Sequence, residues 1–113
     1  MENNKTYKPL LIDSIKASIN LEKQRFVGFD GNYCQAGKKA LGVVDAETEK
    51  EQFAPVAING ILLVVCGDIV NAFDDITSDA EGRAVVCTSQ DTSNGFALDG
   101  GEEGDVIRIV RGI

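Results

Sequence analysis

From Arg25 onward, the apolar residues occur in short runs that are separated by stretches rich in Gly, Asn and Asp. Runs of this length and spacing, many of them β-branched or aromatic, are typical of short strands joined by tight turns. The expected strands are Arg25–Phe29, Ala40–Asp45, Phe53–Ile58, Ile61–Cys66, Ala84–Thr88, Phe96–Leu98 and Asp105–Arg111. This pattern predicts an all-β fold, namely a small β-barrel or β-sandwich of short antiparallel strands.

Two features refine this expectation in the middle of the chain. Asn59-Gly60 lies between two apolar runs and predicts a β-hairpin, because both central residues of a type I′ turn need φ > 0. Pro55 has no N–H to donate to a ladder, so it predicts an edge or a bulge for its strand. The charged stretch 46–51 has helical propensity but is too short to form more than a turn or an exposed loop.

Residues 1–24 follow a different pattern. Residues 7–12 suit an extended conformation, whereas Leu11, Ile12, Ile15 and Ile19 also fit the spacing of a short amphipathic helix. We leave the two conformations open and predict an N-terminal arm, residues 1–24, that becomes ordered on contact. Residues 25–113 are expected to form a single β-domain.

The charge is divided unevenly along the chain. Residues 1–40 carry seven bases and four acids, whereas residues 41–113 carry four bases and fourteen acids, giving +3, −10 and a net charge of −7. The acidic total argues against non-specific nucleic-acid binding. A basic first segment suggests contact with something negative, either the acidic body of a neighbouring copy or another acidic protein surface. The alternative is a solvated tail with chance lysines.

The composition of the 113-residue chain excludes several kinds of chemistry. The chain has no His, which rules out Ser-His-Asp and Cys-His nucleophile pairs and zinc sites that contain His. Cys34, Cys66 and Cys87 fit neither a disulfide framework nor a metal knuckle. Cys66 and Cys87 close apolar runs and are expected to be buried, whereas the turn around Cys34 favours exposure. We expect synthesis in a reducing cytoplasm.

Other candidate sites are weak. The acidic residues Asp74, Asp75, Asp79 and Glu81 lack the spacing of a calcium loop. The aromatic residues at 26, 29 and 33 have bases nearby, as a nucleic-acid stacking platform does, but a core position is expected for the first of them. Neither a phosphate-binding glycine motif nor a catalytic residue is found, and we expect no cofactor. The longest apolar run is too short to cross a bilayer, and the N-terminus does not resemble a secretory signal.

The order of five segments resembles a known family. The segments are Ala36–Val43, Ile61–Val70, Ser78–Val85, Gly95–Leu98 and Gly104–Val110. Together they are similar to the small capsid cement, or head decoration, proteins of tailed bacteriophages and prophages (the DUF2190 and head-fibre-like family). The resemblance extends from Arg25 to Arg111. Two departures from the family pattern are cysteines at 66 and 87, where small residues are expected, and the length of the arm.

The resemblance implies a non-enzymatic virion structural protein. Such a protein is a compact β-domain, often a homotrimer, that docks on the outer surface of an expanded phage head and stabilises it by clamping major capsid subunits. The implied partners are the major capsid protein and other copies of the chain, with no nucleic acid and no membrane, and the implied location is the outer capsid surface of a virion assembled in a bacterial host. Candidate contacts with the capsid or with other subunits are Lys5, Tyr7, Lys8, Leu10, Leu11, Ile12, Ile15, Arg108 and Arg111.

Two alternatives come from other classes of protein. One is a phage tail or neck structural protein, or a β-domain adaptor that binds another protein through an edge strand. The other is a cupin-like enzyme or ligand-binding barrel, which the missing histidines argue against.

Overall fold

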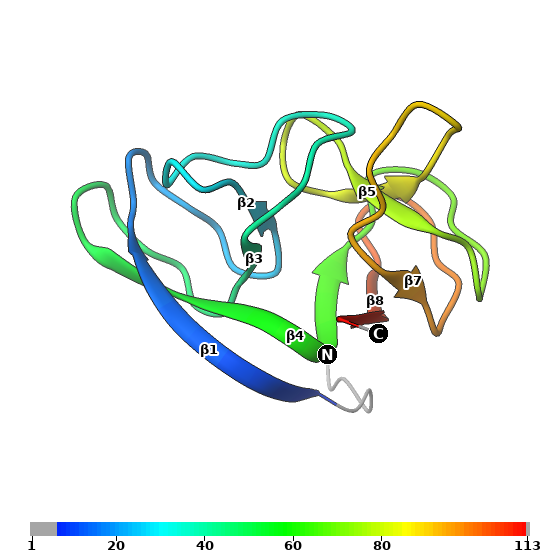
Figure 1. The fold of residues 1–113 in the computed structure, drawn as a ribbon, viewed down its shortest axis with the longest axis horizontal. Helices are drawn as coiled ribbons and strands as arrows, with labels where there is room; N and C mark the ends of the chain where they lie inside the picture. Colours follow the sequence, from blue (N-terminus) through cyan, green and yellow to red (C-terminus); the bar gives the residue numbers. More distant parts are fainter. Residues whose placement is uncertain (1–6, 113) are drawn as a thin grey trace.

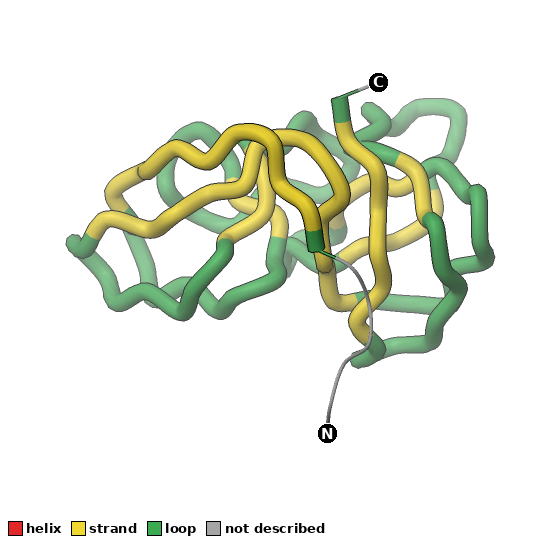
Figure 2. Tube along the Cα trace, turned by 90° about the horizontal axis from the view of Figure 1, so that it is seen from below, coloured by secondary structure: helices red, strands yellow, loops and turns green. Residues whose placement is uncertain are grey.

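The computed structural model describes residues 7–112, which form strands and no helix. Figures 1 and 2 show these strands joined by long loops. The strands are β1 (Lys8–Lys16), β2 (Phe26–Val27), β3 (Gly42–Val44), β4 (Phe53–Val65), β5 (Ile76–Ser78), β6 (Ala84–Val86), β7 (Phe96–Ala97) and β8 (Val106–Arg111). The predicted all-β fold is confirmed.

The strands form one curled antiparallel sheet and one small hairpin. The order in the main sheet is β2-β3-β4-β8-β7, and β1 lies along β4 as an additional strand. Strands β5 and β6 pair with each other only. In Figure 1 the curl of β4 carries the sheet from one half of the molecule to the other, so that it forms a half-barrel.

The strand β4 shows that the hairpin expected at Asn59-Gly60 is wrong. β4 runs from Phe53 to Val65 without a break, and both apolar runs belong to it. Its first part pairs with β1, and at residues 56 and 57 also with β3, whereas its last part pairs with β8; residues 60 and 61 pair with both β1 and β8. Gly60 has φ 109, so the special backbone conformation that the sequence signalled produces a bend within a strand. Hydrogen-bonding partners are available on both sides of the bend, so the chain continues instead of folding back.

The sequence predicted an edge or a bulge for the strand of Pro55. The edge is wrong because β4 is central, whereas the pairing of β4 with β1 does contain register shifts, opposite residues 57–60. The carbonyl oxygen of Pro55 accepts a hydrogen bond from the backbone N–H of Asp45, with an N–O distance of 2.9 Å. In a strand, the N–H and C=O of one residue point to the same side. The missing N–H of Pro55 therefore faces the chain just beyond the end of β3, where the ladder has already ended.

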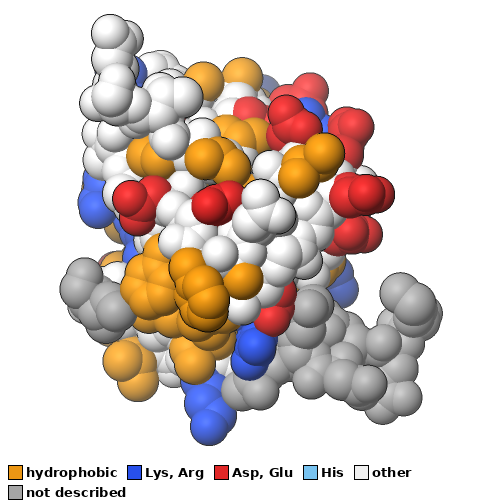
Figure 3. Space-filling model, turned by 90° about the vertical axis from the view of Figure 1, so that its right-hand side faces the viewer, with side chains coloured by type: hydrophobic (Ala, Val, Ile, Leu, Met, Phe, Trp, Pro, Cys, Tyr) orange, Lys and Arg blue, Asp and Glu red, His pale blue; other side chains and the backbone are white. Residues whose placement is uncertain are grey.

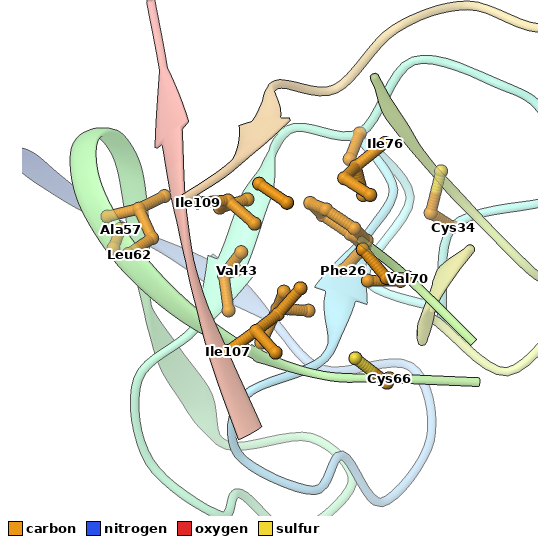
Figure 4. Packing of buried hydrophobic residues seen from close by; sticks show 14 residues of the cluster. Phe26, Cys34, Val43, Ala57, Leu62, Cys66, Val70, Ile76, Ile107 and Ile109 are labelled. Carbon is orange, nitrogen blue, oxygen red and sulfur yellow. The ribbon is translucent and has the colours of Figure 1, made fainter. Parts of the chain in front are cut away.

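The core lies on both faces of the sheet. The side chains of Phe26 and Val27 in β2 point to opposite faces because consecutive residues in a strand alternate. Phe26 belongs to a cluster that includes residues of β4, β5 and β8 (Figure 4), whereas Val27 belongs to a second cluster on the opposite face. Ala17 and Leu21, which follow β1, are buried in this second cluster. The segment after β1 is therefore packed against the rest of the chain.

Of the two conformations left open for the N-terminal segment, residues 8–16 adopt the extended one. The division of the chain at residue 24 stays a prediction.

The expectation for one cysteine is wrong: Cys34 is buried in the first core cluster, where its Sγ lies 3.3 Å from the carbonyl oxygen of Lys38. Cys66 is buried as expected, and Cys87 is half-buried.

Candidate functional site

The most unusual surface of the described chain is strand β1. Among the described strands it pairs with β4 alone, so its outer edge has no strand partner. Three consecutive aliphatic side chains on it are exposed: Leu10 by 82%, Leu11 by 52% and Ile12 by 48%. Unpaired strand edges are usually protected against other chains by charges, prolines or bulges. β1 has such features, including Pro9, Asp13 and two register shifts, but its three exposed aliphatic side chains still make it a candidate for contact with another protein.

The irregular register of β1 explains this exposure. The pairing with β4 shifts between Pro9 and Leu11 and again between Leu11 and Ile12. Such bulges bend the strand and change where its side chains point. In a strand that covers a core with one face, exposed and buried side chains alternate, whereas here neighbouring residues are exposed together. The aliphatic surface of β1 therefore extends over both sides of the strand.

Polar and apolar contacts fix the two ends of β1. Tyr7, just before the strand, packs against the first core cluster, and its hydroxyl donates a hydrogen bond to the carboxylate of Asp45. Burial and the nearby Asp45 carboxylate raise the pKa of Tyr7 well above its ordinary value of 10.0. At the other end Ile15 packs against the second core cluster, and Lys16 forms an ion pair with Glu51 at 3.2 Å. The exposed residues thus lie between two anchored ends.

The two arginines of β8 are used within the subunit. Arg111 is 8% exposed, and its guanidinium donates hydrogen bonds to the carbonyl oxygens of Ala40, Leu41 (2.6 Å) and Ile58 (2.8 Å). Burial lowers the pKa of Arg111. Arg108 lies on the opposite face of the strand and makes two hydrogen bonds to the carboxylate of Asp99, at 2.9 and 3.1 Å.

The structure brings together only part of the set of contact residues expected from the sequence. Lys8, Leu10, Leu11 and Ile12 lie together on exposed β1. Tyr7 and Ile15 flank them and are half-buried, and Arg108 and Arg111 lie on β8, with the side chain of Arg111 turned inward. Lys5 lies outside the described residues. Whether any of these residues touches a capsid or another subunit stays a prediction.

A second exposed apolar surface was not expected from the sequence. Ile69 and Phe73 are exposed in the loop between β4 and β5. Figure 3 views the molecule from the side that lies at the right of Figure 1. There, hydrophobic side chains lie close to acidic ones. The sequence signal was an aromatic residue inside a polar stretch, Asn71-Ala72-Phe73-Asp74-Asp75, with no alternating pattern that would place it in a core.

The acidic residues that the sequence analysis considered as a metal site include Asp79, which has a structural role. The carboxylate of Asp79 accepts hydrogen bonds from the backbone N–H groups of Glu81 and Arg83 and forms an ion pair with the Arg83 side chain. In residues 7–112, no group of three or more Asp, Glu, Cys or His residues is arranged to hold a metal ion. The same residues include no helix that is long and apolar enough to cross a membrane.

A shallow depression of about 300 Å³ is lined by Phe29, Tyr33, Lys38 and Lys39, among others. Phe29 is exposed beside it, whereas Phe26 is in the core, as expected. The Arg25 guanidinium lies 5.8 Å from the centre of the Tyr33 ring. Phe26 and Phe29 are thus divided between the core and the surface, which agrees with the sequence-based argument against a stacking platform.

No protein-family model matches this sequence, and no curated protein sequence matches it. Among solved structures, the chain is similar to the N base of the head fiber gp8.5 of bacteriophage phi29. The TM-score is 0.75, the sequence identity is 19%, and the alignment covers 90% of this chain and 93% of that chain. At this identity the similarity shows a shared fold, and it extends over nearly the whole of both chains.

Proposed function

We propose that the protein is a non-enzymatic structural component of a phage virion that attaches to the head. The observation that carries this proposal is the fold shared with the N base of a phage head fiber over 90% of the chain. Fold alone does not define function. A near-complete match of both chains, together with an exposed aliphatic edge strand, nevertheless supports a domain whose task is contact with other proteins.

The finer proposal concerns where and how the protein acts. On this proposal it binds the outer surface of an expanded head as a homotrimer and stabilises the shell by clamping neighbouring major capsid subunits. Repeated weak contacts suffice for such a role, because linking several binding surfaces raises the apparent affinity without any new kind of contact. Of the exposed residues of β1, Lys8 and Leu10–Ile12 are the proposed surface for contact with the capsid or with another copy.

Co-sedimentation tests this function. Purified full-length protein is mixed with expanded, undecorated heads of the phage or prophage that encodes it, and with unexpanded shells as a comparison. The proposal predicts saturable binding to expanded heads at a fixed number of copies per capsomer. Protein that stays in the supernatant with both kinds of shell would contradict it.

The free edge of β1 favours one alternative, a tail or neck protein or an adaptor that binds its partner by strand pairing. This alternative predicts that the protein co-purifies with tails or connectors and does not sediment with heads that lack them. The same sedimentation assay, carried out with isolated tails, distinguishes the two functions.

A further inference from the structure

The loop between β4 and β5 makes a tight turn over residues 71–74. The N–H of Asp74 donates to the carbonyl oxygen of Asn71 at 3.2 Å, and the Asp74 carboxylate accepts from the N–H of Asn71 at 2.9 Å. Phe73, at the third position of this turn, has φ 75. A positive φ at the third position is typical of a type II turn, where glycine or asparagine is the usual residue. The turn therefore carries a large aromatic residue where the backbone favours glycine.

The ring of Phe73 contributes little to packing within the subunit. Its side chain is 78% exposed, whereas Phe29 and Phe53 are exposed by 66% and 69%. The other described non-glycine residues with positive φ, Gln24 and Glu51, are polar. Strained residues that the surrounding structure holds in place are often functional. Since neither the backbone nor the core accounts for an aromatic residue here, a contact outside the subunit is the remaining physical reason for it.

The backbone on both sides of Phe73 is fixed by the neighbouring loop. The N–H of Phe73 donates to the carbonyl oxygen of Ala97 at 2.7 Å. Val70 and Gly101 exchange two backbone hydrogen bonds of 2.9 Å each. A ring on a fixed backbone loses little conformational freedom when it is covered by a partner.

Two carboxylates follow the ring directly in the chain, those of Asp74 and Asp75. Asp75 is exposed, and within residues 7–112 its carboxylate forms no hydrogen bond and no ion pair. Lys39 and Arg111 line the same depression of about 320 Å³ as Asp75, but neither forms an ion pair with it. A basic side chain can lie over an aromatic ring while its charge is met by carboxylates, and arginine does both at once. The loop therefore fits a partner that presents arginine or lysine.

We propose that Phe73, Asp74 and Asp75, here the Phe73 surface, form a second contact surface that binds an arginine or lysine side chain of a major capsid subunit. The inference rests on the proposed function and deepens it, because clamping two neighbouring subunits requires two surfaces on different parts of the molecule. In Figure 1, β1 lies at the lower left, whereas the loop that follows β4 lies at the right.

The test uses Phe73→Gly in the full chain, with two measurements. The first is sedimentation with expanded, undecorated heads over a range of protein concentrations. We expect half-saturation at a concentration about 10-fold higher or more than for the unchanged protein, as for the loss of a central aromatic contact. The second is thermal unfolding of the free protein. The unfolding temperature should rise, because glycine suits the positive φ of the turn and the exposed ring leaves no cavity.

Two matched controls separate the Phe73 surface from a general effect of ring or charge. Phe29→Ala removes a ring that is also exposed and should leave half-saturation unchanged. Asp75→Asn should weaken binding about 3-fold in low salt, and the difference should disappear in high salt, where charges are screened. Glu47→Gln removes an exposed carboxylate from the loop after β3 and should bind as the unchanged protein does.

Each contrary result has its own meaning. Equal half-saturation of Phe73→Gly and the unchanged protein would overturn the Phe73 surface and leave the proposed function standing. An unchanged protein that stays in the supernatant would overturn both. A lower unfolding temperature for Phe73→Gly, or an equal loss of binding in Phe29→Ala, would contradict a specific contact at this ring. Unaltered binding of Asp75→Asn in low salt would overturn the basic partner.

Discussion

At the residue scale, Gly60 sets the position where the longest strand bends. A β carbon built at this position would lie 2.4 Å from the carbonyl oxygen of Lys8 and 2.9 Å from the backbone nitrogen of Leu10. The first value is shorter than any contact such an atom normally makes. The bend of β4 and its close pairing with β1 therefore both depend on the missing side chain, since a residue other than glycine would push β1 away.

We predict that Gly60→Ala destabilises the protein by about 3 kcal/mol or more, because it adds a steric clash to the cost of a positive φ. Urea denaturation measures this loss. Gly104→Ala is the matched control: its φ of 89 is also positive, but no atom lies within 4 Å of the added carbon. That variant should lose only about 1 kcal/mol, the backbone part alone. Equal losses in the two variants would show that β1 is free to move away from Gly60.

Replacing each of the two arginines of β8 should change the stability of the protein by different amounts. Arg111→Met leaves the carbonyl oxygens of Ala40, Leu41 and Ile58 without their donor, and we expect a loss of about 3 kcal/mol in the free energy of unfolding. Arg108→Met removes a two-bond ion pair with Asp99 and should cost less stability than Arg111→Met, because the Arg108 side chain is 31% exposed and partly screened by solvent. Thermal unfolding of both variants is the measurement. A larger loss for Arg108→Met would contradict this account of the strand.

Because of Tyr7, we predict that the free energy of unfolding decreases at alkaline pH. Burial and the Asp45 carboxylate raise its pKa in the folded protein above the ordinary value of 10.0. The unfolded chain therefore releases this proton first, and the stability that is present below about pH 10 falls as the pH rises further. Denaturant midpoints in a pH series measure the effect. Tyr7→Phe should show a smaller alkaline decrease, and identical slopes in the two proteins would contradict the assignment.

Individual residues show which structural features could be predicted from the sequence and which could not. Asn59-Gly60 correctly signalled an unusual backbone conformation, but a bend and a turn use the same residues, and only the partners on either side of β4 decide between them. The alternation in residues 106–111 correctly gave a strand. It gave no sign that Arg111 is turned inward, because the carbonyl oxygens that hold its side chain come from loops and strands distant in the sequence.

At the scale of elements, short apolar runs predicted strands well and their lengths poorly. The run Ala40–Asp45 contributes only Gly42–Val44 to the sheet, since a strand extends only as far as its partner's hydrogen-bonding groups. The exposed strand β1 was harder to predict. Its aliphatic residues fitted a helix and a strand equally, and the choice depends on the free edge of β4, which the sequence of residues 8–16 does not encode.

Hydrogen exchange should separate β1 from the centre of the sheet. We predict that amides of Leu10–Ser14 exchange at least about 10-fold faster than those of Leu62–Val65, because β1 is an exposed edge strand and the latter segment is buried against β8. Exchange measured by mass spectrometry gives both rates in one sample. Protection of β1 that increases with protein concentration would add evidence for a contact between copies. Equal exchange in the two segments at low concentration would contradict the prediction.

At the scale of the whole molecule, the class of fold was predictable from the sequence, whereas the exposed surface was visible only in the structure. The all-β prediction rested on spacing that many folds share, so it did not by itself distinguish a barrel from a sandwich. The exposed aliphatic residues of β1 and the exposed ring of Phe73 became visible only when the chain was folded. The uneven charge, by contrast, was already present in the sequence.

The most direct test of the proposed function is to locate the protein on the particle. Electron cryomicroscopy of heads from the encoding phage or prophage, with and without the intact gene, compares the two maps at the head surface. We predict additional density that fits this half-barrel on the outside of the expanded head and disappears in its absence. Two identical heads, or density found only on the tail or neck, would contradict the proposal that the protein decorates and stabilises the shell.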